Sequence, residues 1–232
     1  NMALLGGYTS REGNISIAGA LEMGLTLQET ELRLSANADP YFRYDVALTG
    51  HSHDGTMEVA FEEAFVSTLA IPGIILRAGK FLVNFGKANL QHIHSRRFID
   101  APRPLGHVFG ADHLLGTGVS IDYLAPLPFF TELNMQAVQP HWNYDSHAHE
   151  RAHEEEESEH SPDPDKLLSY GLHLKTFFDL TDSISLELGA SGLFNRTAEM
   201  AFQRAWGLDL TLKWVPVDAS RYRSLEWLTE YM

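Results

Sequence analysis

The stretch AWGLDLTLKW (residues 205–214) alternates between apolar and polar side chains at every second residue. Successive side chains of a β-strand point to opposite faces, so the tryptophans and leucines share one face. Eight residues of strand separate Trp206 from Trp214, which is about 26 Å, or about 20 Å along a membrane normal at a tilt of about 40°. Membrane barrels carry an apolar band of about this height between two aromatic girdles. We therefore expect both tryptophans to belong to a lipid-facing girdle.

A soluble β-sandwich strand with two core tryptophans is the alternative interpretation of this stretch. Strands of soluble proteins average only about five or six residues, whereas the period of two here extends over ten residues. The length therefore favours a membrane strand.

The same alternation continues through the rest of the chain. It is clearest over residues 41–49, 115–123, 129–137, 169–179 and 183–188. Such segments predict long strands with one apolar and one polar face. The sequence contains no run of about 18 apolar residues, which excludes a helical membrane protein.

The predicted connections alternate between short and long. Short turns are expected at residues 38–40, 71–73, 125–128, 181–183 and 215–221. Longer connections are expected at residues 50–56, 86–114, 140–166 and 196–202. Tight turns at one end and long loops at the other are typical of an up-and-down barrel. The sequence thus predicts an all-β, antiparallel, transmembrane β-barrel forming one domain over residues 1–232, with ten strands, or eleven if residues 14–23 form one.

A few positions break the alternation. The phase slips between residues 27 and 31, which predicts a turn or bulge near Gln28. Glu63 falls on the apolar face of its strand, so either a bulge intervenes or the strand is partly covered. Leu124 and Leu193 fall on faces that are otherwise polar.

The composition excludes several classes of function. The chain has a formal net charge of -14 and no cysteine. A nucleic-acid partner is not expected, because phosphate binding requires a basic face. Disulfides, thiolate zinc sites and cysteine catalysis are excluded. No spacing of serine and histidine singles out a nucleophile, so we do not expect an enzyme.

Basic residues gather in one part of this acidic chain. Between residues 77 and 103 there is one acid, Asp100, and six of the 17 basic residues: Arg77, Lys80, Lys87, Arg96, Arg97 and Arg103. One interpretation is that residues 86–114 fold into the barrel and place a basic constriction in the path of anions. The other is that these cations balance lumen carboxylates such as Glu58, Glu62 and Glu132, with no role in selectivity.

Histidines gather in a second segment, the predicted external loop at residues 141–166. Between residues 141 and 160, seven carboxylates lie among five imidazoles, those of His141, His147, His149, His153 and His160. Imidazole and carboxylate together suit zinc, nickel or copper. We expect weak zinc binding without a fixed geometry and no required cofactor. The alternative is a solvated acidic surface loop.

Other histidines are weaker candidates for a metal site. These are His51, His53, His92, His94, His107 and His113. The pair at positions 92 and 94 falls in the segment that is expected to fold inward. Isolated histidines of this kind are more often structural than metal-binding.

Several short motifs together resemble a known family. They are ADPYFR (38–43), the strand with paired glutamates at 59–68, RAGKF (77–81), FGK (85–87) and QHIH (91–94). Over residues 25–128 the chain resembles porin-like proteins often labelled zinc-regulated outer-membrane receptors, and more distantly phosphate-selective porins. The resemblance implies a complete barrel of about 16 or more strands, of which this chain is a part.

The receptor label also implies TonB coupling, but the sequence shows no plug domain and no energy-coupling box, which favours a porin-like protein. Family members tend to carry an acidic pair after the infolded loop, where this chain has Ala111-Asp112-His113. We do not carry an acidic role over to this position.

These observations predict an outer-membrane channel for passive diffusion of small hydrophilic or anionic solutes. We expect contact with outer-membrane lipid, a link to divalent metal acquisition and assembly as a homo-oligomer. The alternative is a non-conducting structural or metal-binding barrel with a plugged lumen. Conductance in a planar bilayer separates the two.

Overall fold

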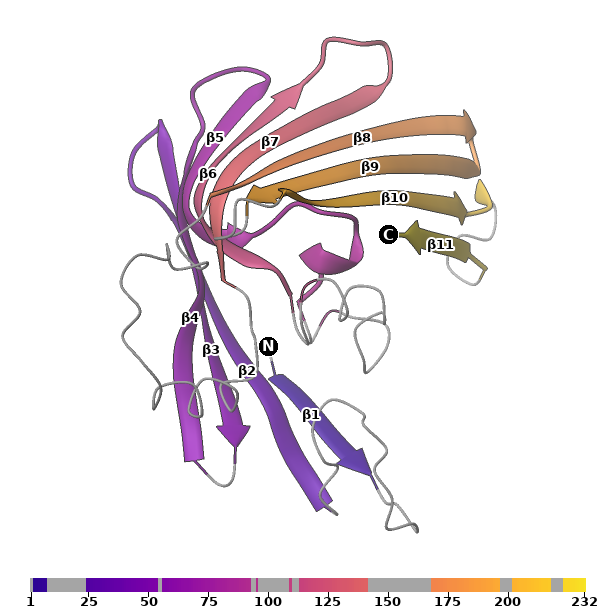
Figure 1. The fold of residues 1–232 in the computed structure, drawn as a ribbon. Helices are drawn as coiled ribbons and strands as arrows, with labels where there is room; N and C mark the ends of the chain where they lie inside the picture. The colour runs from indigo at the N-terminus through magenta and orange to yellow at the C-terminus, as the bar shows by residue number, and fades with distance from the viewer. Residues whose placement is uncertain are drawn as a thin grey trace.

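The computed structural model describes residues 2–7, 24–53, 56–92, 95, 109, 113–141, 168–196, 202–217 and 223–232. Eleven strands form one antiparallel sheet in which each strand pairs with its neighbours in the sequence (Figure 1). They are β1 (Met2–Gly7), β2 (Gly24–Asn37), β3 (Phe42–His53), β4 (Thr56–Thr68), β5 (Ile74–Leu82), β6 (Leu115–Leu124), β7 (Phe130–His141), β8 (Ser169–Thr181), β9 (Ile184–Arg196), β10 (Phe202–Trp214) and β11 (Leu225–Tyr231). A short 3₁₀ helix, η1 (Ala88–Leu90), follows β5. The predicted all-β, antiparallel, up-and-down fold is confirmed.

The strand count agrees with the sequence, but the eleventh strand lies elsewhere. It is β1 at residues 2–7, whereas residues 14–23 lie outside the described residues. In the described sheet β1 and β11 are at the two edges and do not pair with each other. No described helix has the length and hydropathy of a membrane-spanning helix.

The prediction of a longer connection at residues 50–56 is wrong. Strands β3 and β4 stay paired as far as His53 and Thr56, which leaves only Asp54 and Gly55 between them. Polar residues are accommodated in a strand as readily as in a loop, and Asp-Gly is a favoured two-residue hairpin connection. Polarity alone therefore did not identify a loop.

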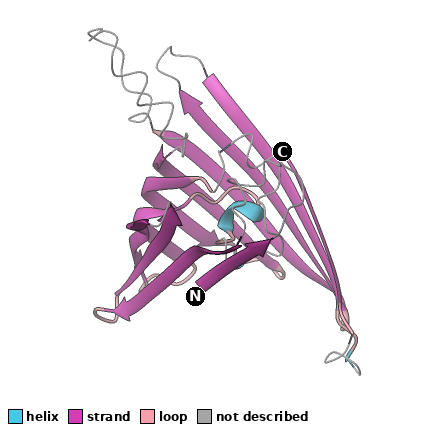
Figure 2. Ribbon diagram, turned by 90° about the horizontal axis from the view of Figure 1, so that it is seen from below, coloured by secondary structure: helices cyan, strands magenta, loops and turns pink. Residues whose placement is uncertain are grey.

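The sheet has two chemically different faces. It curves around η1, and we call the face toward η1 the inner face and the opposite one the outer face (Figures 1 and 2). The inner face is polar, with buried Thr49, Ser120, Asn134, Ser191 and Asp209. The outer face carries exposed apolar side chains, including Leu32, Tyr44, Phe61, Leu76, Val119, Met135, Leu172, Leu208 and Trp227.

Both phase slips correspond to irregularities in strand pairing. Gln28 has no partner in β1, because Ala3 pairs with Glu29 and Leu4 with Leu27. The register between β3 and β4 shifts in the same way at Glu62, since the residues on either side of it pair with Ala47 and Leu48. A β-bulge of this kind adds one residue to one strand and changes its phase.

The segment after β5 lies against the inner face. We call residues 83–92 the infolded segment. It contributes Val83, Phe85 and Ala88 to a small apolar core that also contains Phe81, Phe109, Leu114, Val138 and Leu193. Leu193 thus occupies an inner-face position because it packs against this segment. Leu124, the other apolar residue at such a position, is exposed near a turn.

Asn89 holds together the two ends of the connection between β5 and β6. Its side-chain amide donates to the carbonyls of Val83 and Leu114, and its Oδ1 accepts the N–H of Leu114 at 2.7 Å. The side chain is fully buried. Its polar atoms are therefore satisfied by the backbone of Val83 and Leu114, which lie just after β5 and just before β6.

Candidate functional site

A group of charged side chains lies where the infolded segment meets β2 and β4. We call it the carboxylate–histidine cluster, and it consists of Glu31, Arg33, Glu62, Glu63 and His92. The three carboxylates are only 5%, 8% and 7% exposed. Burying charges costs free energy unless they are paired with opposite charges or bound to a metal.

His92 is at the centre of this cluster. Its Nδ1 lies 3.2 Å from Oε1 of Glu62 and 3.5 Å from Oε2 of Glu31. Its Nε2 lies 3.3 Å from Oε2 of Glu63. The imidazole therefore bridges three carboxylates on two strands that are not neighbours in the sheet.

The surroundings of His92 change its protonation. Burial on its own lowers the pKa of His92, but hydrogen bonds to Glu62 and Glu63 outweigh burial and raise this pKa to about 10. This pKa favours the charged imidazole at neutral pH, whereas the Arg33 guanidinium, 2.9 Å from Nε2, opposes it.

Arg33 is the cation of the cluster, and His113 lies beside it. The guanidinium of Arg33 forms an ion pair with Glu63 and lies 3.7 Å from Oε1 of Glu31. Nε2 of His113 lies 3.5 Å from Oε1 of Glu62, and the rings of His92 and His113 are 6.1 Å apart. The two histidines are thus on the same side of Glu62.

The β-bulge explains why two consecutive glutamates are both buried on the inner face. In a regular strand, Glu62 and Glu63 would point to opposite faces. Residue 62 is the extra residue of the bulge, so Phe61 is 58% exposed on the outer face while both carboxylates point inward. The sequence predicted Glu62 as a lumen carboxylate, but it did not predict Glu31, Glu63 or Arg33 beside it.

A second group of contacts holds the other end of the infolded segment. Nζ of Lys87 donates to Oε1 of Glu187 and to Oγ1 of Thr211, both at 2.8 Å. The N–H of Ala88 donates to Oε2 of Glu230 at 3.0 Å. The segment is therefore attached to β9, β10 and β11 as well as to β4.

Gly86 allows the chain to turn at this point. Its φ is +62°, and a Cβ there would lie only 1.8 Å from Oε1 of Glu230. Its N–H donates to Oγ of Ser191, which is itself 2.7 Å from Nδ1 of His173. The same hydroxyl thus links Gly86 to His173, and the tautomer of the imidazole decides which of the two side chains donates.

The predicted basic constriction is only partly described. Arg77 is on the inner face, where it pairs with Asp122 at 3.5 Å and lies over the rings of Phe65 and Phe81. Lys87 is paired as above. Arg96, Arg97 and Arg103 lie outside the described residues.

The structure places Lys80 on the outer face. Lys80 pairs with Thr117, two residues from Val119, which pairs with Ala78 and is 53% exposed. Directly paired residues share a face. Its ammonium donates to the carbonyl of Phe61 at 2.7 Å. Arg77 and Lys80 are three residues apart in one strand, and an odd separation puts them on opposite faces.

The predicted carboxylate partners of these cations are found in different contacts. Glu132 pairs with Lys175 at 3.4 Å, and Glu62 contacts histidines. The side chain of Glu58 is outside the described part of the structure. Of the described cations of the 77–103 region, Arg77 and Lys87 thus pair with Asp122 and Glu187 instead.

Most of the predicted histidine sites cannot be placed. His141 ends β7, but its side chain is not among those described, and His147, His149, His153 and His160 lie outside the described residues. The same holds for His94 and His107, while His51 and His53 are in β3, without described side chains. His92 and His113 are the two histidines that the structure brings together.

The outer face carries aromatic side chains toward both ends of its strands. Toward the loop end, Phe194 packs edge-on against Trp206, with ring centroids 5.1 Å apart. At the turn end, Phe129 lies 4.9 Å from Phe178, and Trp214 ends β10. Trp206 and Trp214 share the outer face with Leu208, Leu210 and Leu212, in agreement with the predicted alternation.

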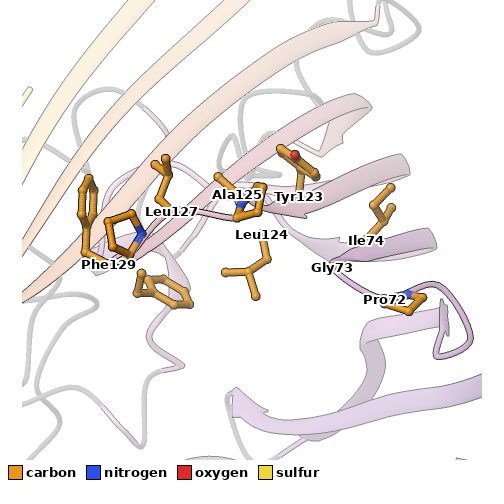
Figure 3. A pocket seen from close by; sticks show the side chains of 11 residues that line it. Pro72, Gly73, Ile74, Tyr123, Leu124, Ala125, Leu127 and Phe129 are labelled. Atoms are coloured by element: carbon orange, nitrogen blue, oxygen red, sulfur yellow. The ribbon is translucent and has the colours of Figure 1, made fainter.

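Figure 3 shows an apolar hollow at the turn end, between the turn that precedes β5 and the turn that joins β6 to β7. It is lined by Pro72, Ile74, Tyr123, Leu127 and Phe129, together with their neighbours. Its walls are hydrophobic and exposed, so it continues the aromatic surface rather than forming a polar binding site.

Comparison with known proteins gives little functional information. No protein-family profile matches the chain. Over 216 residues it is 33% identical to an uncharacterized protein of Aquifex aeolicus (strain VF5), and the match covers 88% of this chain. The chain spans only 44% of the length of that relative.

Proposed function

We propose that this chain is part of an outer-membrane, porin-like β-barrel through which small hydrophilic solutes diffuse. The observation that carries the proposal is the outer face, whose exposed apolar side chains extend from β2 to β11. Leu32, Val119 and Leu208 are 55%, 53% and 60% exposed. Soluble proteins rarely expose an apolar patch larger than about 600 Å², whereas a lipid-facing wall requires one.

The aromatic contacts support the same proposal. Tyr170 and Phe178 in β8, like Trp206 and Trp214 in β10, are eight residues apart on the outer face. Two strands thus carry aromatic residues at a spacing of about 26 Å, which matches the two interfaces of a tilted barrel wall. A soluble sandwich has no need for such a repeat.

A complete barrel requires more strands than the described sheet contains. Strands β1 and β11 leave backbone N–H and C=O groups at the two edges without a strand partner in the described sheet. Lipid cannot satisfy these groups, so a membrane sheet has to close. We propose that further strands, from a longer chain or another copy, complete it.

The charges on the inner face influence which solutes would pass through the proposed channel. Five described cations have carboxylate partners: Arg33, Arg43, Arg77, Lys87 and Lys175. Paired cations attract anions weakly. Anion preference therefore depends on Arg96, Arg97 and Arg103 and stays a prediction, while the described wall favours neutral or cationic solutes.

A non-conducting barrel is the second candidate function. The observation in its favour is the apolar packing of Val83, Phe85 and Ala88 against the inner wall, which fills part of the interior. Polar contacts attach the infolded segment to six strands, β2, β4, β7 and β9–β11, and this attachment strengthens the candidate.

Recording from the purified protein in planar lipid bilayers tests the channel. We expect discrete conductance steps from protein that circular dichroism shows to be folded. Folded, vesicle-inserted protein without conductance would establish the plugged barrel instead. Protein that stays in the aqueous phase after mixing with lipid vesicles would contradict both membrane functions.

A further inference from the structure

Three ligand atoms in the carboxylate–histidine cluster lie close enough to share one ion. One atom each from Glu31, Glu62 and His92 lies within 4.8 Å of the other two. Tetrahedral ligands at about 2.1 Å from zinc are about 3.4 Å apart. The distances from Nδ1 of His92 to the two carboxylates, 3.2 and 3.5 Å, already match this spacing.

Glu62 provides an independent sign of a missing partner. Its side chain is more than nine-tenths buried, yet its Oε2 accepts no hydrogen bond among the described residues. An unsatisfied buried carboxylate oxygen costs free energy. A cation next to His92 that both oxygens of Glu62 bind would remove this cost, because a metal-bound oxygen needs no hydrogen bond.

The charges in the cluster also favour a cation. Glu31, Glu62 and Glu63 contribute three negative charges, whereas Arg33 contributes one positive charge. Arg33 pairs with Glu63, and its guanidinium lies 3.7 Å from Oε1 of Glu31 and 2.9 Å from Nε2 of His92. A divalent ion between Glu31 and Glu62 would balance the remaining two charges when the imidazole is neutral.

The other ring nitrogen of His92 is placed as in known metal sites. Nε2 lies 3.3 Å from Oε2 of Glu63 and 2.9 Å from Nη2 of Arg33, which pairs with the same carboxylate oxygen. Histidine ligands commonly donate their second N–H to a carboxylate, which fixes the tautomer and the ring orientation. Glu63 is thus a positioning residue, and His113, 3.5 Å from Oε1 of Glu62, lies beside the three ligands without belonging to their group.

We propose that Glu31, Glu62 and His92 bind a divalent transition-metal ion that fastens the infolded segment to the barrel wall. The ligands come from β2, from the β4 bulge and from the end of the infolded segment, so an ion would crosslink all three. Mixed imidazole and carboxylate ligands suit Zn²⁺, Co²⁺ or Mn²⁺ better than Ca²⁺, which prefers six to eight oxygens. Metal binding at this site does not require the protein to conduct solutes, so it can be tested independently of the proposed channel.

Metal titration of the full chain tests the proposal. Isothermal titration with Zn²⁺, after chelator treatment, should give one equivalent that binds more tightly than any contribution from the histidine-rich loop. Co²⁺ should give visible absorption bands in the same stoichiometry. Glu62→Gln and His92→Gln should each weaken the tight equivalent at least 100-fold, and Glu63→Gln about 10- to 100-fold.

Glu230→Gln is the matched control. Glu230 is another inner-face glutamate that contacts the infolded segment, through Ala88, but it is not part of the cluster. It should leave the tight equivalent unchanged. A wild-type protein without a tight equivalent would overturn the proposal. Folded Glu62→Gln or His92→Gln protein that retains the tight equivalent would also overturn the proposal. The cluster would then be a network of ion pairs that is stabilised by protonation and not by a metal ion.

Discussion

Nδ1 of His92 lies 3.2 Å from Oε1 of Glu62, although 30 residues separate them in the sequence. This contact joins the infolded segment to the wall at the one place where β4 contains a bulge. The position of the segment therefore depends on the extra residue in β4.

The protonation of His92 predicts a pH-dependent stability for the metal-free protein. The groups that face it are Glu31 and Arg33 on β2, Glu62 and Glu63 on β4, and His113. Its folded pKa of about 10 exceeds the unfolded value of about 6.5, so the stabilisation is complete below pH 6.5 and is lost as pH rises through 10.

Denaturant titrations with a chelator at pH 6.5 and pH 9.5 measure this effect. We expect wild-type protein to lose more unfolding free energy over this interval than His92→Gln, by on the order of 2 kcal/mol. Parallel pH profiles for the two proteins would mean that His92 is not charged in the folded state.

The outer face predicts how arginine substitutions depend on position. Leu210 lies midway between Trp206 and Trp214, so Leu210→Arg should cost about 2–4 kcal/mol in lipid. Ser185→Arg on the inner face, beside Asp179 and Lys213, should cost less than about 1 kcal/mol. Unfolding in phospholipid vesicles measures both, and equal costs would exclude a lipid-facing outer surface.

Charge substitutions on the two faces should differ in their effect on ion selectivity. Lys87 is on the inner side and Lys80 on the outer face. Removing a unit charge about 8 Å from a passing ion changes its energy by about 0.5 kcal/mol in water, a factor of about two in permeability.

Lys87→Gln should therefore raise the ratio of K⁺ to Cl⁻ permeability about twofold, as measured by reversal potentials in a salt gradient. Lys80→Gln makes the same chemical change and should leave the ratio unaltered. The opposite ranking of the two variants would show that Lys80 lines the pore.

We expect alanine to destabilise the protein more at Gly86 than at Gly73. Both glycines have positive φ, so each substitution strains the backbone by about 1–2 kcal/mol. At Gly73 a Cβ meets only ordinary contact, with the carbonyl of Leu124 at 3.5 Å. At Gly86 a Cβ would displace the carboxylate of Glu230 and break the hydrogen bond that this carboxylate accepts from the N–H of Ala88.

We expect Gly86→Ala to lower the free energy of unfolding by about 1–3 kcal/mol more than Gly73→Ala, the value of a hydrogen bond to a charged group. Chemical denaturation measures the difference. Equal losses would mean that the bond from Ala88 to Glu230 contributes nothing to stability.

Strands and faces could be predicted from the sequence because side chains alternate regularly along a strand. The apolar positions between Trp206 and Trp214 needed only this rule. The same rule places Arg77 and Lys80 on opposite faces, so their assignment to one pore lining conflicted with the predicted strand. Polarity at residues 50–56 was a weaker signal, because inner-face strand residues are polar as well.

The cluster around His92 could not be predicted in the same way. Its members lie about 30 and 60 residues apart in the sequence. They come together only because the infolded segment follows a particular path, and that path is determined by contacts along the whole inner wall. The available signals were the two phase slips. One precedes Glu31 by three residues and the other falls at Glu62, so both irregularities occur beside proposed ligands.

The strand order has a consequence for any complete form of the sheet. Antiparallel neighbours alternate in direction, so β1 and β11, the first and last of eleven, run the same way. Joining these two edges directly would create a parallel pair. Antiparallel closure instead requires an odd number of added strands, which gives an even total, as in bacterial single-chain barrels. Two copies inserted in the same direction would not meet this condition by themselves, because β11 of one copy would run parallel to β1 of the other.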